Sequence, residues 1–232
     1  MIRAVILDLD NTLYAYEPLN EEASAKVREF ICGQLKITGP QYEEAYNFGK
    51  KETKKRLGNV GASHNRLLYF QKTLEYLGVN PIPLSLQMYE IYWGTFLEKM
   101  SLREGAGEFM DCMLEHGIRI MICTDLTAHI QHRKIEALGI ADKICYLVTS
   151  EEAGIEKPAP EIFAFCLDKL KLPPEEVCCI GDDPRKDVEG AAAAGIRAFL
   201  FRSEEPGAPQ FEEMAEQILQ QQCESAKQIN GN

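Results

Sequence analysis

In the second half of the chain, short apolar runs alternate with segments of helical periodicity, and no other feature constrains the fold as much. This alternation is typical of parallel strands joined by helices that cover both faces of one sheet. The apolar run Ala4–Leu7 supplies one more strand. We therefore expect an α/β fold with a doubly wound, Rossmann-like parallel sheet. The expected strands are 4–7, 118–123, 144–149, 177–180 and 197–201, and the expected helices are 128–138, 160–170, 187–194 and 210–222.

Residues 15–101 interrupt the alternation and contain no convincing buried strand. Their apolar residues recur with helical spacing, as Ala23, Val27 and Ile31 do. We expect a core of residues 1–14 and 102–232 and an inserted all-helical domain of residues 15–101, with hinges near 15–18 and 100–105. The helices expected in the insertion are 20–35, 40–57, 64–77 and 84–100.

The first strand ends in two acids, Asp8 and Asp10, which are two residues apart. Alternate residues of a strand share one face, so both carboxylates can point at one site just past its end. Two like charges held so close are costly unless a cation or a shared proton relieves them. The pair therefore predicts a metal site.

Further polar residues follow the later strands. Thr124 and Asp125 come directly after 118–123, and Asp182 comes shortly after 177–180. In a doubly wound sheet, ligands bind outside the carboxyl ends of the strands. We therefore expect Asp8, Thr124 and Asp182 to meet at that edge.

Four segments follow one another along the chain: Asp8-Leu9-Asp10-Asn11-Thr12, the strand-end Thr124, Lys157-Pro158 and Gly181-Asp182-Asp183-Pro184-Arg185-Lys186-Asp187. In this order, they resemble the four motifs of the haloacid dehalogenase superfamily. The resemblance covers residues 1–14 and 102–201. The insertion directly after the first motif is similar to the helical cap domain of one subclass of this superfamily.

The resemblance also implies catalytic roles. Asp8 is the nucleophile that takes up a phosphoryl group, and Asp10 is the acid and base that protonates the leaving oxygen and later takes a proton from water. Thr124 offers its hydroxyl to a phosphoryl oxygen, and Lys157 places its ammonium between nucleophile and phosphate. Asp125 departs from the family pattern, in which an asparagine often follows the threonine, and it would repel an anionic substrate unless it turns away.

Magnesium is the implied cofactor, because Mg²⁺ prefers oxygen ligands and uses one or two carboxylates beside substrate phosphate. Asp8 and Asp182 are the expected direct ligands, together with the backbone carbonyl of Asp10. Asp183 and Asp187 lie four residues apart where a helix is expected to begin, so one can reach the metal through water while the other caps the helix. We favour Asp187 as the residue that reaches the metal through water, and leave Asp183 open.

The sequence thus predicts a magnesium-dependent phosphatase that hydrolyses a small phosphorylated metabolite through an aspartyl-phosphate intermediate. The alternatives are a phosphomutase with the same aspartyl-phosphate chemistry and a catalytically silent binding or regulatory member of the fold. Dehalogenation ranks last, because the dehalogenases of the superfamily lack an acid at the position of Asp10. The identity of the substrate and the oligomeric state stay open.

The net charge of −11 argues against a nucleic-acid partner, which needs a concentrated basic surface. No run of eighteen apolar residues occurs, so we expect no membrane span and a cytoplasmic location. The inserted segment nevertheless carries a basic cluster of Lys50, Lys51, Lys54, Lys55 and Arg56. This cluster and the following segment 58–66 are the candidates in the insertion for contact with an anionic substrate.

Overall fold

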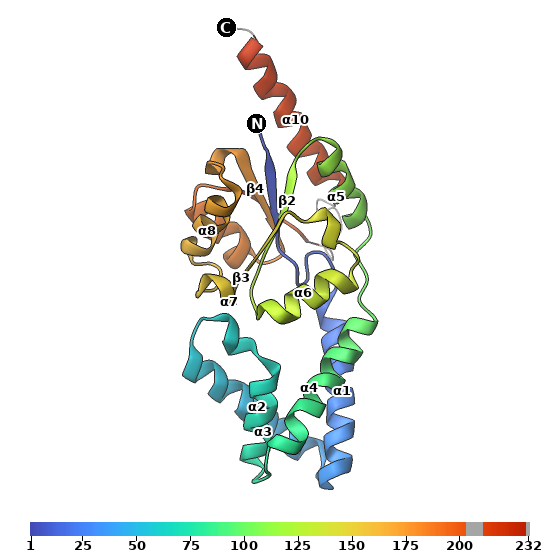
Figure 1. Cartoon of the computed structure of the whole chain (residues 1–232). Coiled ribbons are helices and arrows are strands. Elements are labelled where there is room, and N and C mark those ends of the chain that lie inside the picture. The colour runs from blue at the N-terminus through green and yellow to red at the C-terminus, as the bar shows by residue number, and fades with distance from the viewer. Residues whose placement is uncertain (203–210, 231–232) are drawn as a thin grey trace.

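The computed structural model of the protein describes residues 1–202 and 211–230, with side chains for all of these except 221–230. Within these residues, five parallel strands form one sheet in the order β3-β2-β1-β4-β5 (Figure 1). The predicted α/β fold with a Rossmann-like parallel sheet is confirmed. The strands are β1 (Ala4–Leu7), β2 (Arg119–Thr124), β3 (Tyr146–Thr149), β4 (Val177–Gly181) and β5 (Arg197–Leu200).

The central strand β1 pairs with β2 on one side and with β4 on the other. Its last residue, Leu7, lies opposite Ile122 of β2 and Ile180 of β4. The backbone N–H of Asp8 extends the ladder by donating to the carbonyl of Ile180 at 2.9 Å. The carboxyl ends of these three strands therefore meet at one edge of the sheet.

Both faces of the sheet are covered, which explains why β1 is apolar at every position. Val5 and Leu7 pack into the core on one face, and Ala4 and Ile6 pack into the core on the other. Helices on the first face are α5 (Ala106–Glu115), α6 (Ala128–Ala137) and α10 (Phe211–Asn230); those on the second are α8 (Pro160–Leu170) and α9 (Gly190–Ala193).

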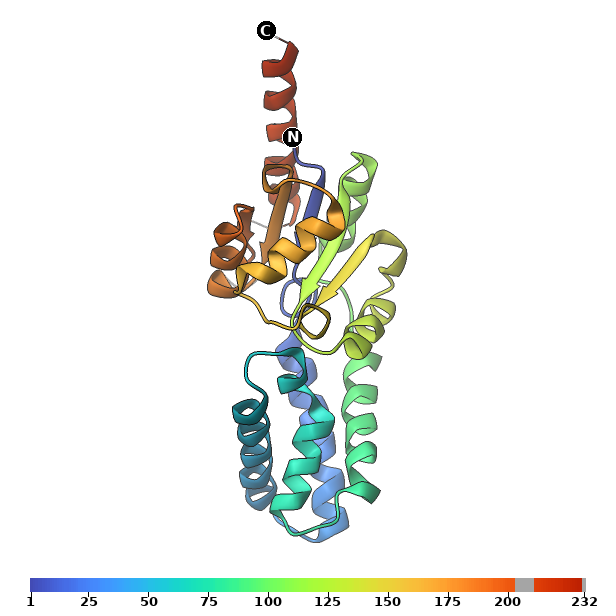
Figure 2. The same ribbon diagram turned by 60° about the vertical axis from the view of Figure 1, so that its left-hand side comes forward.

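Residues 15–101, which we call the cap, are helical throughout their regular structure. Helix α1 packs against α4, and α2 packs against α3. Figures 1 and 2 both show the cap at the edge where the strands end, with the N-terminus and helix α10 at the opposite end of the molecule. The division into two domains at the expected boundaries stays a prediction. The cap helices are α1 (Tyr16–Leu35), α2 (Gly39–Leu57), α3 (Arg66–Tyr76) and α4 (Ile82–Glu98), with a 3₁₀ turn, η1 (Gly61–His64).

Several elements differ from the sequence-based expectation, among them the one-turn helix α7 (Ser150–Ala153), which was not predicted. Helix α5 was not predicted, because a ten-residue segment shows few repeats of the helical period. The expected helix 187–194 is instead a wide π-helical turn, Pro184–Glu189, followed by the short α9. Helix α10 continues to Asn230, beyond the expected end at 222; residue 210 and the last residues of the tail, 231–232, lie outside the described residues.

Among the described residues, no helix is both long enough and apolar enough to cross a membrane.

A substitution at Gly190 tests how closely α9 packs on the rest of the core. A Cβ there would lie 2.7 Å from the Phe163 ring and 3.0 Å from the backbone of Pro158. We predict that Gly190→Ala destabilises the protein by about 1–3 kcal/mol through overpacking, measured by urea unfolding. Gly94→Ala is the matched control, because a Cβ at Gly94 meets nothing within 4 Å, and it should be neutral or stabilising by up to about 1 kcal/mol. Equal effects of the two substitutions would contradict this packing.

Candidate active site

Asp8 lies just past the carboxyl end of β1 with its side chain almost fully buried. Its Oδ2 accepts a hydrogen bond from the Thr12 hydroxyl at 2.8 Å, and its Oδ1 accepts one from the Lys157 ammonium at 2.6 Å. The Thr12 oxygen also accepts a bond from the backbone N–H of Asp182 at 3.1 Å, which ties the loop after β1 to the loop after β4. The Asp8 carboxylate is therefore held in one orientation from both sides.

Lys157 is the buried cation of the site. Its ammonium donates to Asp8 and to Asp187 Oδ1, each at 2.6 Å, and to the carbonyl of Cys123 at 3.2 Å. Burial by itself lowers the pKa of Lys157, but the carboxylates of Asp187 and Asp8 outweigh it and raise the pKa well above its ordinary value. Lys157 therefore stays charged and holds the two carboxylates together.

Asp8, Asp182 and Asp187 form an acidic cluster, in which one oxygen from each lies within 4.8 Å of the others. Burial raises the pKa of Asp8 to about 8, since desolvation and repulsion from Asp187 exceed the attraction of Lys157. Burial, followed by repulsion from Asp187, raises the pKa of Asp182 to about 6. One lysine thus leaves the cluster short of positive charge. Three carboxylate oxygens at this spacing are donors that suit a hard divalent cation such as Mg²⁺.

The structure separates the two acids that the sequence left ambiguous. Asp183 Oδ1 accepts hydrogen bonds from the backbone N–H groups of Arg185 and Lys186, both at 2.9 Å, so its side chain caps the turn that follows β4. Asp187 lies in the acidic cluster, and its Oδ2 accepts from the backbone N–H of Asp183 at 3.0 Å.

Thr124, at the end of β2, is buried beside the cluster. Its hydroxyl oxygen accepts a hydrogen bond from the Gln131 amide at 2.7 Å. The neighbouring Asp125 turns to Lys186, whose ammonium donates to Asp125 Oδ2 at 2.7 Å, while Asp125 Oδ1 accepts from the backbone N–H of Lys157. The negative charge of Asp125, at a position where the family often has asparagine, is thus neutralised by Lys186 of the core.

The Asp10 side chain is not part of the acidic cluster. Its Oδ1 accepts a hydrogen bond from the Lys134 ammonium at 2.6 Å and another from the Tyr14 hydroxyl. Both donors use Oδ1, and no hydrogen bond to Oδ2 is found among the described residues. Asp10 is therefore anchored by one oxygen while the other remains for a bound molecule.

Lys134 is fully buried, and aromatic rings surround its ammonium. The ring centroids lie 5.5–5.7 Å from Nζ, a range at which a cation interacts favourably with a π face. Burial lowers the pKa of Lys134, and the charge of Asp10 opposes that effect. One ring, Tyr14, precedes the cap, and the other three belong to it: Tyr16, Trp93 and Phe96.

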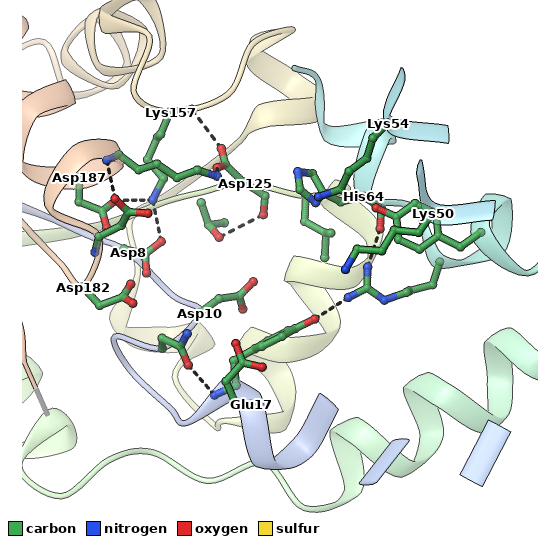
Figure 3. A pocket seen from close by; sticks show the side chains of 18 residues that line it. Asp8, Asp10, Glu17, Lys50, Lys54, His64, Asp125, Lys157, Asp182 and Asp187 are labelled. Atoms are coloured by element: carbon green, nitrogen blue, oxygen red, sulfur yellow. Dashed lines mark hydrogen bonds and ion pairs between the residues drawn. The ribbon is translucent and has the colours of Figure 1, made fainter. Parts of the chain in front are cut away.

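A cavity of about 330 Å³ contains all of the predicted site residues (Figure 3). Asp8, Asp182, Asp187 and Lys157 lie on one side of it, and the cap residues Lys50, Lys54 and His64 lie on the other. Lys51, Lys55 and Arg56 of the predicted basic cluster are not among its lining residues. The core contributes Asp8, Asp10, Asn11, Thr124, Asp125, Leu126, Lys157, Asp182, Asp183, Lys186 and Asp187, and the cap contributes Tyr16, Glu17, Lys50, Lys54, His64, Arg66 and Tyr69.

The turn η1 of the cap contacts the core directly. His64 Nε2 lies 2.9 Å from Glu156 Oε1. A Cβ on Gly61 would lie 2.6 Å from the backbone nitrogen of Glu151 and 2.8 Å from the carbonyl of Leu126, so only glycine fits this approach. The structure therefore shows the cap in contact with the rim of the site.

Sequence reasoning missed Lys134, Gln131 and Glu156 as site residues. Gln131 and Lys134 are buried on α6 together with Ile130 and Ile135. Two polar residues three apart on an otherwise apolar helix face were the sequence signal that could have pointed to them. Glu156 directly precedes the predicted Lys157, but an acid beside a lysine carries no signal by itself.

With this geometry established, comparison with known proteins identifies the class. The sequence model of the haloacid dehalogenase-like hydrolases matches residues 2–195, and the chain belongs to this family. A ribulose-1,5-bisphosphate 5-phosphatase from Halopiger xanaduensis is 40% identical over 204 residues, covering 87% of this chain and 85% of the relative. A glyceraldehyde 3-phosphate phosphatase from Methanopyrus kandleri is 32% identical over 204 residues, covering 87% of this chain and 84% of that protein. The predicted enzyme class, a hydrolase that acts on phosphate esters, is confirmed.

Solved structures agree with the fold. A 2-haloacid dehalogenase from Pseudomonas syringae pv. Tomato superposes with a TM-score of 0.75 at 21% identity, covering 95% of this chain and 99% of the other. A HAD phosphatase from Thermococcus onnurineus superposes with a TM-score of 0.71 at 20% identity, covering 94% and 98%. At these identities the likeness supports the fold alone.

The adjacent residues Asp182 and Asp183 allow a test of whether the acidic cluster binds Mg²⁺. We predict that Asp182→Asn weakens Mg²⁺ binding on the order of 100-fold in calorimetric titration, because it removes one charged oxygen of the cluster. Asp183→Asn is the matched control, because an amide oxygen can still cap the turn, and it should bind Mg²⁺ almost as the unmodified protein does. Equal losses of Mg²⁺ affinity in both variants would show that the metal does not bind at the cluster.

Proposed function

We propose that this protein is a magnesium-dependent phosphatase that hydrolyses a small phosphorylated metabolite through a phosphoryl group carried on Asp8. The observation that carries the proposal is the arrangement around Asp8: a buried carboxylate clamped by Lys157 and Thr12, grouped with Asp182 and Asp187, in one cavity with the separately anchored Asp10.

In the first half of the reaction, an oxygen of Asp8 bonds to the phosphorus of the substrate as the bond from phosphorus to the ester oxygen breaks. Asp10 gives its proton to that ester oxygen. In the second half, Asp10 takes a proton from a water molecule, whose oxygen bonds to phosphorus while the bond to Asp8 breaks. Inorganic phosphate leaves, and both acids return to their starting states.

The residues around Asp8 handle the charge of the transferred group. In this proposal, Lys157 and the Thr124 hydroxyl would bond its equatorial oxygens, and electrostatic stabilisation of this kind is the main source of catalysis in phosphoryl transfer. Asp8, Asp182 and Asp187, with the backbone carbonyl of Asp10, would hold the Mg²⁺. When bound, Mg²⁺ supplies positive charge that offsets the negative charge of the phosphoryl group and of the carboxylates.

Lys134 serves as a positioning residue for Asp10. It fixes Oδ1 and leaves Oδ2 for proton transfer. Because three of the four rings around Lys134 come from the cap, we propose that Asp10 is aligned only when the cap, residues 15–101, is closed over the cavity. The cap then also excludes water from the site, as lids do in other enzymes.

The substrate class is a short sugar phosphate or a similar metabolite. A cavity of about 330 Å³ lies at the small end of the range for ligand sites, which is about 300–1,000 Å³. The relatives from Halopiger xanaduensis and Methanopyrus kandleri carry the names of phosphatases for ribulose-1,5-bisphosphate and glyceraldehyde 3-phosphate, and both compounds fit this description.

Trapping of the phosphoryl-enzyme tests the roles of the two acids. We predict that Asp10→Asn accumulates phosphorylated protein with p-nitrophenyl phosphate, because this leaving group needs little protonation while water activation is lost. Asp8→Asn should never be labelled, because it lacks the group that bonds to phosphorus. Intact-protein mass spectrometry measures both variants. Labelling of Asp8→Asn to the same extent would place the nucleophile elsewhere.

Lys134→Met tests the positioning of Asp10. We predict that kcat falls by about tenfold or more for an alkyl phosphate, which is part of the roughly 10²–10⁴-fold that a positioned acid contributes, and falls less for p-nitrophenyl phosphate. Lys171→Met, on a side chain that is 76% exposed, is the control and should retain full activity. If Lys134→Met slows both substrates equally, the lysine supports the fold rather than proton transfer.

A further inference from the structure

On the cap side of the cavity, part of the positive charge has no ion-pair partner among the described residues. Six basic side chains line the cavity, and three of them have carboxylate partners: Lys157, Lys186 and His64. The other three all come from the cap: Lys50, Lys54 and Arg66. Within residues 1–202 and 211–220, none of these three forms an ion pair with a carboxylate.

In the part of the chain that the structure describes, the partners of Arg66 are all neutral. It donates to the Tyr16 hydroxyl at 2.5 Å and to the carbonyl of His64 at 3.2 Å. Its guanidinium lies 5.2 Å and 5.3 Å from the ring centroids of Tyr69 and Tyr92. Its Nε is buried and has no hydrogen-bond partner in residues 1–202 and 211–220. A buried donor that is left unpaired is costly, so it indicates a partner that the protein itself does not supply.

Lys50 and Lys54 lie one helical turn apart on α2, so they share the face that is turned to the cavity. Partial burial lowers the pKa of Lys54, and repulsion from Lys50 and Arg66 lowers it further, against a smaller effect of Glu156. The three cations thus repel one another in the absence of an anion.

Acidic residues of the cavity lie elsewhere. Glu17 is the one acid that the cap contributes to the lining, and Figure 3 shows it beside Asp10 rather than beside Lys54. Asp125 is neutralised by Lys186, and the acidic cluster lies on the opposite side, with Lys157. An anion on the cap side would therefore meet positive charge.

We infer that Lys50, Lys54 and Arg66 form a second anion site, which binds a phosphate or carboxylate group at the end of the substrate remote from the phosphoryl group that is hydrolysed. The inference rests on the proposed function, because it places the hydrolysed group at Asp8. The enzyme then selects short substrates with an anionic group at both ends, and the remote anion ties the cap to the substrate. Binding energy from a remote group is then available to hold the cap closed during the reaction.

The test compares two substrates that differ only in the remote group. Ribulose 1,5-bisphosphate and ribulose 5-phosphate are titrated calorimetrically, with Mg²⁺, into Asp8→Asn protein, which does not turn them over. The variant combines Lys50→Met with Lys54→Met. Its matched control combines Lys51→Met with Lys55→Met, which removes the same charge from the same helix at exposed positions that do not line the cavity.

We expect the Lys50/Lys54 variant to weaken bisphosphate binding by about tenfold or more relative to monophosphate binding, because charge-assisted hydrogen bonds are lost. The Lys51/Lys55 control should leave that ratio within about twofold of its starting value, since these two lysines do not line the cavity. The second site is overturned if the first variant changes neither this ratio nor the corresponding ratio for a remote carboxylate, or if the control shows an equal loss. Arg66 is packed among tyrosines, and its replacement can unfold the cap. The test therefore replaces Lys50 and Lys54, whose exposed side chains can be changed without disturbing the fold.

A second arm distinguishes the two kinds of anion. 3-Phosphoglycerate and glyceraldehyde 3-phosphate differ only in a carboxylate at the remote end, and they are titrated in the same way. A loss confined to the bisphosphate assigns the site to phosphate, and a loss confined to phosphoglycerate assigns it to carboxylate. Failure of the proposed function is a separate outcome: the unmodified protein would release no phosphate from any of these compounds, whatever the binding ratios are.

Discussion

The close approach of three carboxylates at the end of the sheet is the constraint on which the rest of the site depends. It follows from the topology, because β1 and β4 are neighbours and their carboxyl ends deliver Asp8 and Asp182 to the same place. Such crowding is unfavourable without positive charge. Lys157 supplies part of this charge, Thr12 links the two loops, and the capped turn after β4 directs Asp187 inward. The local structure around the cluster can be understood as the means of holding like charges together.

Most of the fold could be predicted from the sequence, because a buried parallel strand leaves a strong apolar signal. The predicted strands begin and end within two residues of β1 to β5. The turn Pro184–Glu189 could not be predicted, since its path depends on hydrogen bonds from Arg185 and Lys186 to Asp183 rather than on periodicity. Helix α10 exceeds its predicted length because its polar end gave no apolar pattern to follow.

The residues of the site also fall into those that the sequence could predict and those that it could not. Asp8, Thr124, Lys157 and Asp182 follow strands or occur in ordered motifs, so their convergence could be expected from the sequence. Lys134 could not, because its partner, Asp10, is 124 residues away in the sequence and its other contacts come from the cap. The basic cluster shows a further limit. Lys50 and Lys54 cannot be told from their neighbours Lys51 and Lys55 by composition, and only the rotation of α2 against α3 decides which pair faces the cavity.

Lys134 belongs to the core, yet most of the rings that surround it belong to the cap. The two parts of the molecule therefore share one polar contact that neither can complete alone. Loss of Tyr16, Trp93 or Phe96 would remove a ring that encloses the buried ammonium, so we expect these residues to change together with the lysine. A chimera that joins this core to the cap of another family member would inherit a buried ammonium without its surroundings, unless the new helices brought aromatic side chains to the same three places.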